Sequence, residues 1–307
     1  MGNKKIIIIE FASLLPGPFA TYLLDKQLFE INKIEDVRNP DQLKHLKPTQ
    51  NGVSVVYNEI NRNKKNIQVD FRSDTGAKKI TDLVKQADIL VENHKPGRMN
   101  KLGFGYQDCL KINPKLIYIS VTGFGQKHPL SQFPAHDLNI LGLSGYLLFN
   151  NNSLIPPLPL ADIFSSYHCA LSILSALIGN RPQYIDLSML DIFIKSSTLI
   201  TTIMKHRQGP LEQDDFILWG SYPCYHIYKT QDKRLMVLSA IEPMFWSDFC
   251  NEINRVDLIG RSLDPNACAE IESIISAKPQ KYWIEKKINS FTPVLSYLES
   301  QKLGYVK

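Results

Sequence analysis

The 307-residue sequence lacks the common signatures of nucleotide, hydrolase and metal sites. It has no GxGxxG after its first apolar run, no GxxxxGK[ST] and no GxSxG. A conventional dinucleotide cradle, a P-loop and an α/β-hydrolase nucleophile elbow are therefore not predicted. It also has no HExxH motif and no cluster of Asp, Glu and His at metal-ligand spacing, so we predict no metal site.

Cysteine is scarce, and long apolar runs are missing. The five cysteines are odd in number, far apart and without a CxxC pair, which is typical of reduced thiols in a cytoplasmic protein. The apolar runs read as too short to cross a membrane, so no membrane partner is expected. The net charge of +5 is too small and too evenly spread to indicate nucleic acid. It suits a small polyanionic ligand.

The first 35 residues read as strand, turn, helix and strand. Ile6–Ile9 is a continuous β-branched run, and Pro16-Gly17-Pro18 then breaks the chain. Phe19–Phe29 groups its apolar residues on one helical face, and Ile31–Ile34 is a second apolar run. This order predicts a doubly wound α/β sheet. Further strands are predicted at Val53–Tyr57, Ile67–Phe71, Ile89–Val91, Leu116–Val121 and Tyr184–Leu187.

The pattern changes in the last third of the chain and predicts a second domain. Tyr222–Thr230 and Leu235–Ala240 read as two strands of a hairpin, because only four residues separate them. We predict a large Rossmann-like domain over residues 1–205, a linker over 206–220 that contains Gly209-Pro210, and a smaller α+β domain over 221–307. The last segment, which begins near residue 292, is expected to be a short return toward the large domain.

A histidine and an aspartate flank a proline-punctuated loop. His136 is either a loop residue that hydrogen-bonds a neighbour or a base, and Asp137 beside it can orient its ring. Asp162 is either a helix cap or an acid whose pKa is raised by apolar neighbours. Glu242 precedes a proline-started helix and is either a capping carboxylate or part of a site. A His and an Asp in different environments are what two-base proton transfer needs.

The basic loop at 61–66 also has two interpretations. Arg62, Lys64 and Lys65 are either a solvated face or contacts for phosphate groups. The residues alone leave both open.

Many short segments, in a fixed order from residue 6 to about 250, resemble the class III CoA-transferase family, also called CaiB/BaiF. The stretches that carry the resemblance are Pro16–Leu24 with Asn32–Glu35, Asn61–Asp70, Ala87–Gly97, Lys101–Tyr106, Asn113–Ser120 with Thr122–Gln126, Ala135–Asn139 with Leu143–Gly145, Pro159–Asp162 and Ala240–Pro243.

The resemblance implies a Rossmann-like large domain, a small domain and a homodimer of two interlocked chains. It implies an acyl-CoA substrate, with coenzyme A bound as part of that substrate and no permanently bound cofactor. Carried over by position, the groups that hold the adenosine and phosphates of CoA would be Arg38, Arg62, Lys64, Lys65, Asn93, His94 and Lys101.

The family includes enzymes of two chemistries. In its racemases, residues matching His136 and Asp162 exchange the α-proton of a thioester, with Asp137 and Glu242 orienting and tuning them. Backbone amides at the helix start near Asp162 are expected to meet the enolate charge. In its transferases, the residue matching Asp162 attacks the acyl-CoA and forms a mixed anhydride. The histidine favours the racemase, and the transferase is the alternative. A non-catalytic CoA-binding relative is a third possibility, because Ala135 and Ser165–His168 replace glycines usual in the family.

Overall fold

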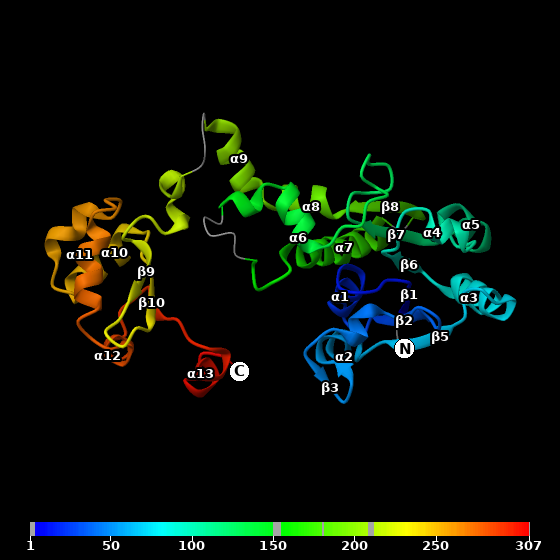
Figure 1. Ribbon diagram of the computed structural model, residues 1–307, viewed down its shortest axis with the longest axis horizontal. Helices are drawn as coiled ribbons and strands as arrows, with labels where there is room; N and C mark the ends of the chain where they lie inside the picture. The colour runs from blue at the N-terminus through cyan, green and yellow to red at the C-terminus, as the bar shows by residue number, and fades with distance from the viewer. Residues whose placement is uncertain (1–3, 150–154, 180, 208–211, 307) are drawn as a thin grey trace. The chain divides into compact units, whose positions relative to one another are not determined.

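The computed structural model describes residues 4–149, 155–179, 181–207 and 212–306, and it divides into two compact units, 1–202 and 203–307 (Figure 1). Each unit has its own hydrophobic core. The Gly209-Pro210 pair of the predicted linker lies outside the described residues.

The first unit is built on a six-stranded sheet in which every neighbouring pair of strands is parallel. Ile8 on the central strand pairs with Ile31 on one side and with Ile89 on the other. In order across the sheet the strands are β5 (Lys65–Val69), β2 (Phe29–Asp36), β1 (Ile6–Glu10), β6 (Ile89–Glu92), β7 (Ile117–Thr122) and β8 (Gln183–Ser188).

The strand order reverses direction between β1 and β6. From β1 the chain moves outward to β2 and β5, then returns to β6 and continues to β7 and β8 on the other side. Open α/β sheets bind ligands at such a switch point, beyond the carboxyl ends of the strands. The segments that follow Glu10 and Glu92 are therefore where a site is expected.

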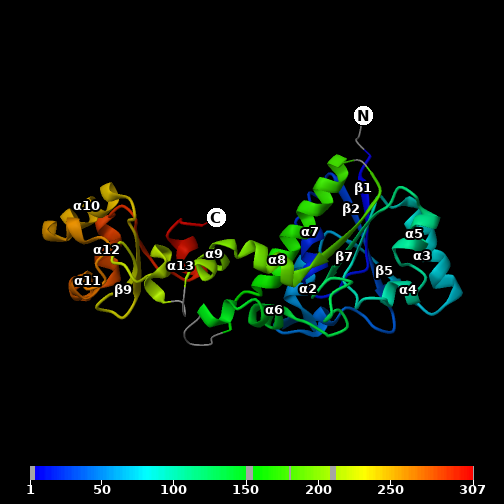
Figure 2. The same cartoon turned by 90° about the horizontal axis from the view of Figure 1, so that it is seen from above.

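Helices cover both faces of this sheet, as expected for apolar strands buried on two sides. On one face α1 (Pro16–Tyr22), α7 (Leu160–Gly179) and α8 (Met189–Ser196) pack into one core cluster. On the other, α3 (Asp74–Gln86), the short α4 (Arg98–Lys101) and α5 (Tyr106–Ile112) form a second cluster. Figure 2 shows α7 and α3 on opposite sides of the strands. The predicted doubly wound α/β class is confirmed.

One predicted strand is wrong. Val53–Tyr57 was expected to be extended, but only β4 (Val53–Ser54) is, paired with β3 (Thr49–Gln50) in a short hairpin. Helix α2 (Val55–Asn61) begins immediately after it. The reason is local: the Ser54 hydroxyl accepts a hydrogen bond from the Tyr57 amide and caps the helix. This cap starts a helix at Val55 and Val56, although valine favours strands.

Helix α7 is longer and more apolar than the sequence pattern predicts. By length and composition alone it meets the test for a membrane-spanning helix, with 39% of its most apolar window buried. Its buried residues are mostly small, among them Ala161, Ser165 and Ala176, and they belong to the side that joins the core of the first unit. One such helix is weak evidence for a membrane span, because core helices of soluble proteins pass the same test, but the expectation that every apolar run is too short was wrong.

The second unit contains a three-stranded antiparallel sheet. The predicted hairpin is present as β9 (Tyr225–Lys229) and β10 (Leu235–Ser239), and β11 (Phe291–Pro293) pairs with the other edge of β10. Buried Trp246, Phe249 and Trp283 fill the core between sheet and helices. The helices of this unit are α9 (Thr198–His206), which begins in the first unit, α10 (Pro243–Glu252), α11 (Ala267–Ile275), α12 (Gln280–Lys286) and α13 (Tyr297–Lys302).

Candidate functional site

A cavity of about 240 Å³ lies at the switch point of the sheet, and both His136 and Asp162 line it. We call it the reaction cavity. These two residues are 26 positions apart in the sequence, and the fold brings both to the lining of one cavity. The remaining lining residues are Ser13, Leu14, Pro16, Asn93, His94, Lys95, Pro96, Val121, Thr122, Gly123, Ser131, Phe133, Pro134, Ala135 and Met189.

His136 is fixed by its place at the start of a helix. It is the N-cap of α6 (Asp137–Leu143), with extended backbone angles, and its amide donates to Asn139 Oδ1 at 3.0 Å. Its side chain is exposed. An exposed imidazole beside a cavity can accept and release protons.

Asp162 lies in the first turn of α7, where the structure places it partly buried. Burial, with a smaller contribution from the charge of Asp137, raises its pKa from the ordinary 3.8 to about 7. The acid is therefore partly protonated at neutral pH. It can donate a proton in one form and accept one in the other, as predicted from its apolar neighbours.

Asp137 has a different role from the one expected. Its Oδ1 accepts hydrogen bonds from the backbone amides of Ala161 and Asp162, at 2.6 and 3.3 Å. It thus caps the start of α7 from 24 residues away in sequence. The expectation that it orients His136 is corrected to a role at Asp162. Because these two amides are occupied, they do not form the free anion-binding pair that was expected to meet an enolate.

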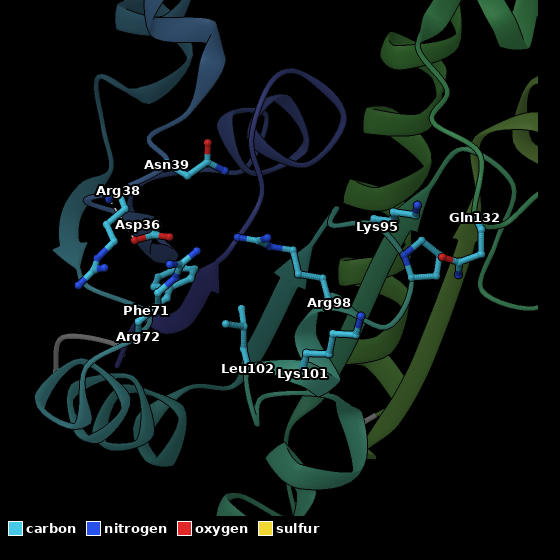
Figure 3. Close-up of a pocket in the computed structure, with 11 residues that line it drawn as sticks. Asp36, Arg38, Asn39, Phe71, Arg72, Lys95, Arg98, Lys101, Leu102 and Gln132 are labelled. Atoms are coloured by element: carbon cyan, nitrogen blue, oxygen red, sulfur yellow. Dashed lines mark hydrogen bonds between the residues drawn. The ribbon is translucent and has the colours of Figure 1, made fainter.

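A second and larger pocket, of about 590 Å³, has mostly basic side chains among its charged lining residues. We call it the basic pocket. Figure 3 shows Arg98 extending into the middle of the group of lining side chains. Its Nε atom is buried and has no partner among the described residues. Five basic side chains line the pocket against a single acid, namely Arg38, Arg72, Lys95, Arg98 and Lys101 against Asp36, and the other lining residues are Asn39, Phe71, Pro96, Leu102 and Gln132.

The basic pocket and the reaction cavity are neighbours. Lys95 and Pro96 line both. They belong to the segment after β6, at the switch point. A long ligand with an anionic end and a reactive end fits this arrangement, with its charged groups among the arginines and lysines and its other end between His136 and Asp162.

The basic loop does not form part of this pocket. Arg62 pairs with Glu59 on its own helix at 3.1 Å, and Lys65 pairs with Glu30 at 2.7 Å. Lys64 is buried, with its Nζ 2.9 Å from Glu10 and 2.8 Å from the Pro18 carbonyl. None of these three cations lines the basic pocket, so the structure does not bring the predicted phosphate contacts of this loop to it.

Asn93 and His94 line the reaction cavity instead of the basic pocket. The side-chain amide of Asn93 makes two hydrogen bonds to Ser13. Its Oδ1 accepts from the Ser13 amide at 2.9 Å, and its Nδ2 donates to the Ser13 carbonyl at 2.7 Å. Burial, with help from the charge of Arg98, lowers the pKa of His94 to about 4. An imidazole with this pKa is neutral at neutral pH and can offer a ligand only an N–H donor, so the predicted contact of His94 with CoA stays a prediction.

Glu242 lies in the second unit as the N-cap of α10. Its side chain is exposed and makes no capping hydrogen bond to that helix. The capping interpretation of this carboxylate is therefore wrong, and its pairing with the histidine stays a prediction.

Three basic lining residues of the basic pocket were not predicted from the sequence. Arg72 follows β5, while Lys95 and Arg98 follow β6. Arg38, which was predicted, follows β2 in the same way and pairs with Asp70 at 2.7 Å. Cations placed just after parallel strands share one edge of the sheet, and that position was the available signal. Among the described residues no group of three His, Cys, Asp or Glu side chains is arranged to hold a metal.

Comparison with known proteins places the chain in a family. A family model described as CoA-transferase family III matches residues 4–297. The acetyl-CoA:oxalate CoA-transferase of Acetobacter aceti is 32% identical over 314 residues, covering 94% of this chain and 79% of that protein. The succinate–glutarate CoA-transferase of Agrobacterium fabrum is 31% identical, covering 62% and 53%. The alpha-methylacyl-CoA racemase of Mus musculus is 31% identical over 255 residues, covering 80% and 62%. The chain spans less than two thirds of the last two proteins.

Solved structures agree on the fold. A CaiB/BaiF family protein from Brucella suis superposes with a TM-score of 0.80 at 21% identity, covering 97% of this chain and 85% of that one. Rv3272 from Mycobacterium tuberculosis, in an orthorhombic crystal form, gives 0.79 at 23% identity, with 97% and 84% covered. The prediction of an enzyme of the CoA-transferase or racemase type is thus confirmed at the level of the family, and the chain belongs to CoA-transferase family III.

Proposed function

We propose that this enzyme of CoA-transferase family III interconverts the two configurations of 2-methylacyl-CoA thioesters, as an alpha-methylacyl-CoA racemase would. One observation carries the proposal: His136 and Asp162 line the same cavity. A transferase needs only the aspartate, so a histidine that lines the same space favours proton transfer. Relatives of both kinds are similar to this chain at nearly equal identity, so identity alone does not decide.

The two pockets fit the two ends of an acyl-CoA. The phosphates of CoA would lie among Arg98, Arg72 and Lys101, and the pantetheine would pass Lys95 into the reaction cavity. Guanidinium groups suit phosphates because their planar donors match two oxygens at once. The thioester α-carbon then lies between the histidine and the aspartate.

The proton transfer follows from the protonation states. A thioester α-proton is weakly acidic, because the carbonyl accepts the charge as an enolate. Neutral His136 removes this proton from one face, and protonated Asp162 delivers its own to the opposite face. The products are the inverted thioester, an imidazolium and a carboxylate. In reverse, the carboxylate of Asp162 removes the proton and the imidazolium returns one. The raised pKa of Asp162 keeps both forms accessible at neutral pH.

The proposal is tested by incubating the enzyme with one configuration of a 2-methylacyl-CoA in D2O. Deuterium should enter the α position while the configuration scrambles. An enzyme that binds the thioester and incorporates no deuterium, for short and long acyl chains alike, contradicts the proposal.

The pH dependence of this reaction should be bell-shaped. The active enzyme holds one proton on the pair, either on Asp162 or on His136. Acid leaves both protonated and base leaves both deprotonated, so kcat/KM falls on each side. The apparent pKa values belong to the pair, with Asp162 contributing a group near 7. Because the equilibrium constant for racemisation is independent of pH, both directions must give the same profile. Measuring kcat/KM for each enantiomer between about pH 5 and 10 checks this.

A close approach between two loops holds the histidine in place. A Cβ atom built on Gly123 would lie 2.7 Å from Cβ of Ala135, which directly precedes His136. Replacing Gly123 by alanine should therefore displace Ala135 and, with it, His136. The exchange rate should fall by about 10–100-fold if the shift of His136 approaches about 1 Å. Adding Ala135→Gly returns the lost space, so the double variant should recover most of the rate. The test measures exchange rates and melting temperatures of the unmodified enzyme, the two single variants Gly123→Ala and Ala135→Gly, and the double variant. A double variant no better than Gly123→Ala contradicts the steric explanation.

A CoA-transferase is the second candidate, and the match to the Acetobacter aceti enzyme over 94% of this chain favours it. Asp162 would then attack the acyl-CoA and form an anhydride. Hydroxylamine added during turnover with a free carboxylate should convert Asp162 to a hydroxamate in this case. An unmodified Asp162 under turnover argues against it.

An interlocked homodimer and a cytoplasmic location stay predictions.

A further inference from the structure

The segment Ala12–Leu14 is held by side chains from three other parts of the chain. The Ala12 carbonyl accepts from Lys33 Nζ at 2.7 Å. Ser13 is bound through both its amide and its carbonyl by Asn93, at 2.9 and 2.7 Å. The Leu14 amide donates to Asp41 Oδ1 at 2.9 Å. Three consecutive backbone positions are thus fixed by three different side chains.

This segment is also strained and tightly packed. Leu14 has a φ of +60°, in the left-handed region that a branched aliphatic residue rarely adopts. A Cβ built on Gly17 would lie only 2.2 Å from Cβ of Ala12, so the turn closes on itself with no room for a larger residue. Strain of this kind persists where the surroundings over-determine it, and it concentrates at functional sites. Ser13 and Leu14 both line the reaction cavity.

A buried ion cluster contacts the segment. Lys33 and Glu10 have fully buried side chains 3.1 Å apart, and Lys33 also lies 3.0 Å from Asp41 Oδ2. Lys64 pairs with the second oxygen of Glu10 at 2.9 Å. The negative charges of the two carboxylates are thus balanced by the positive charges of the two ammonium groups. Burial by itself lowers the pKa of Lys33, but Glu10 and Asp41 outweigh it and raise the pKa. Lys33 therefore stays charged inside the protein.

Lys33 links this cluster to the cavity. It donates directly to the Ala12 carbonyl, and it holds Asp41, which in turn holds Leu14. Lys64 is a natural comparison. It is equally buried and pairs with the same Glu10, but its backbone contact is the Pro18 carbonyl within helix α1. We propose that Lys33 is a positioning residue, which fixes Ala12–Leu14 as a preformed wall of the reaction cavity against which the thioester is aligned.

The kinetic part of this inference rests on the proposed racemase, and the structural part does not. Lys33→Met and Lys64→Met each remove one buried cation beside Glu10 and leave the same charge imbalance. Both should lower the melting temperature. Only Lys33→Met should expose the Ser13 and Leu14 amides, giving at least about 10-fold faster amide hydrogen exchange there. It should also lower kcat for α-proton exchange by about 10–100-fold, with less change in KM. Lys64→Met should retain amide protection at both positions.

A variant without the charge imbalance covers the case in which Lys33→Met does not fold. Lys33→Met/Asp41→Asn removes one cation and one anion, and the asparagine oxygen can still accept from Leu14. We expect faster amide exchange at Ser13 and a lower kcat in this protein too. Unchanged protection and kcat in a folded Lys33 variant, or equal losses in Lys64→Met, would overturn the proposal. If the unmodified enzyme exchanges no α-proton, the racemase proposal fails, and the amide measurement still decides whether Lys33 holds the segment.

Discussion

Replacing His136 by alanine is expected to lower α-proton exchange by about 10²–10⁴-fold, the usual contribution of a positioned proton-transfer group. The fold should be retained, because the side chain is exposed and the contact to Asn139 is made by the backbone amide. The binding of CoA should change little, since His136 lies outside the basic pocket. Exchange in D2O, with CoA binding measured by calorimetry, gives both quantities.

His45 provides the matched control. It is exposed and lies in the 3-10 helix Gln42–His45, and it lines neither pocket. His45→Ala should exchange at the rate of the unmodified enzyme. A His136→Ala protein that keeps full exchange would show that the histidine is not a base. If it instead keeps transfer of CoA to a carboxylate, the transferase is the better description.

Replacing Asp162 by asparagine should lower activity by a similar factor, about 10²–10⁴-fold, whichever chemistry operates. Asparagine keeps the size of the side chain and cannot exchange protons or form an anhydride. Loss of activity in this variant therefore identifies Asp162 as catalytic without choosing between racemase and transferase. The choice depends on His136.

The same variant has a stability signature that separates lost chemistry from lost structure. The pKa of Asp162 is raised in the folded protein from 3.8 to about 7, so folding favours its protonated form. This stabilisation is fully present below the unfolded pKa and is lost as pH rises through the folded one. Asp162→Asn removes the dependence. The melting temperature of the variant, relative to the unmodified protein, should therefore rise between about pH 4 and pH 7. A constant difference would show that Asp162 is not buried as described.

The sequence was sufficient for the six parallel strands and for the two residues, His136 and Asp162, that line the reaction cavity. Apolar β-branched runs such as Ile6–Ile9 have one physical interpretation, because a strand covered on both faces must be apolar throughout. For His136 and Asp162 the residues alone left a structural interpretation open, and the resemblance to the family favoured the catalytic one. Local signals such as these apolar runs do not depend on which distant residues the fold brings together.

The roles of charged residues were predicted less well, because charge in sequence does not reveal its partner in space. Lys64 belongs to a basic run that resembles a phosphate loop, but it reaches Glu10, 54 residues away, and is buried. Lys33 lies in strand β2 among other polar residues, such as Asn32 and Glu35, and nothing in the sequence indicated its link to Asp41. Asp137 was expected to act on its neighbour and instead caps a helix 24 residues on. Each error concerns a long-range pair that only the folded chain defines.

We propose that His136 and Asp162 together move an α-proton, and one reaction distinguishes this from acyl transfer. The unmodified enzyme is incubated in D2O with one configuration of a 2-methylacyl-CoA and an excess of a free carboxylate. Mass spectrometry follows α-deuterium and any new CoA ester, and chiral analysis follows configuration. We predict deuterium incorporation with scrambling of configuration and no new ester. A new ester without deuterium at the α-carbon would contradict the claim and establish acyl transfer through Asp162.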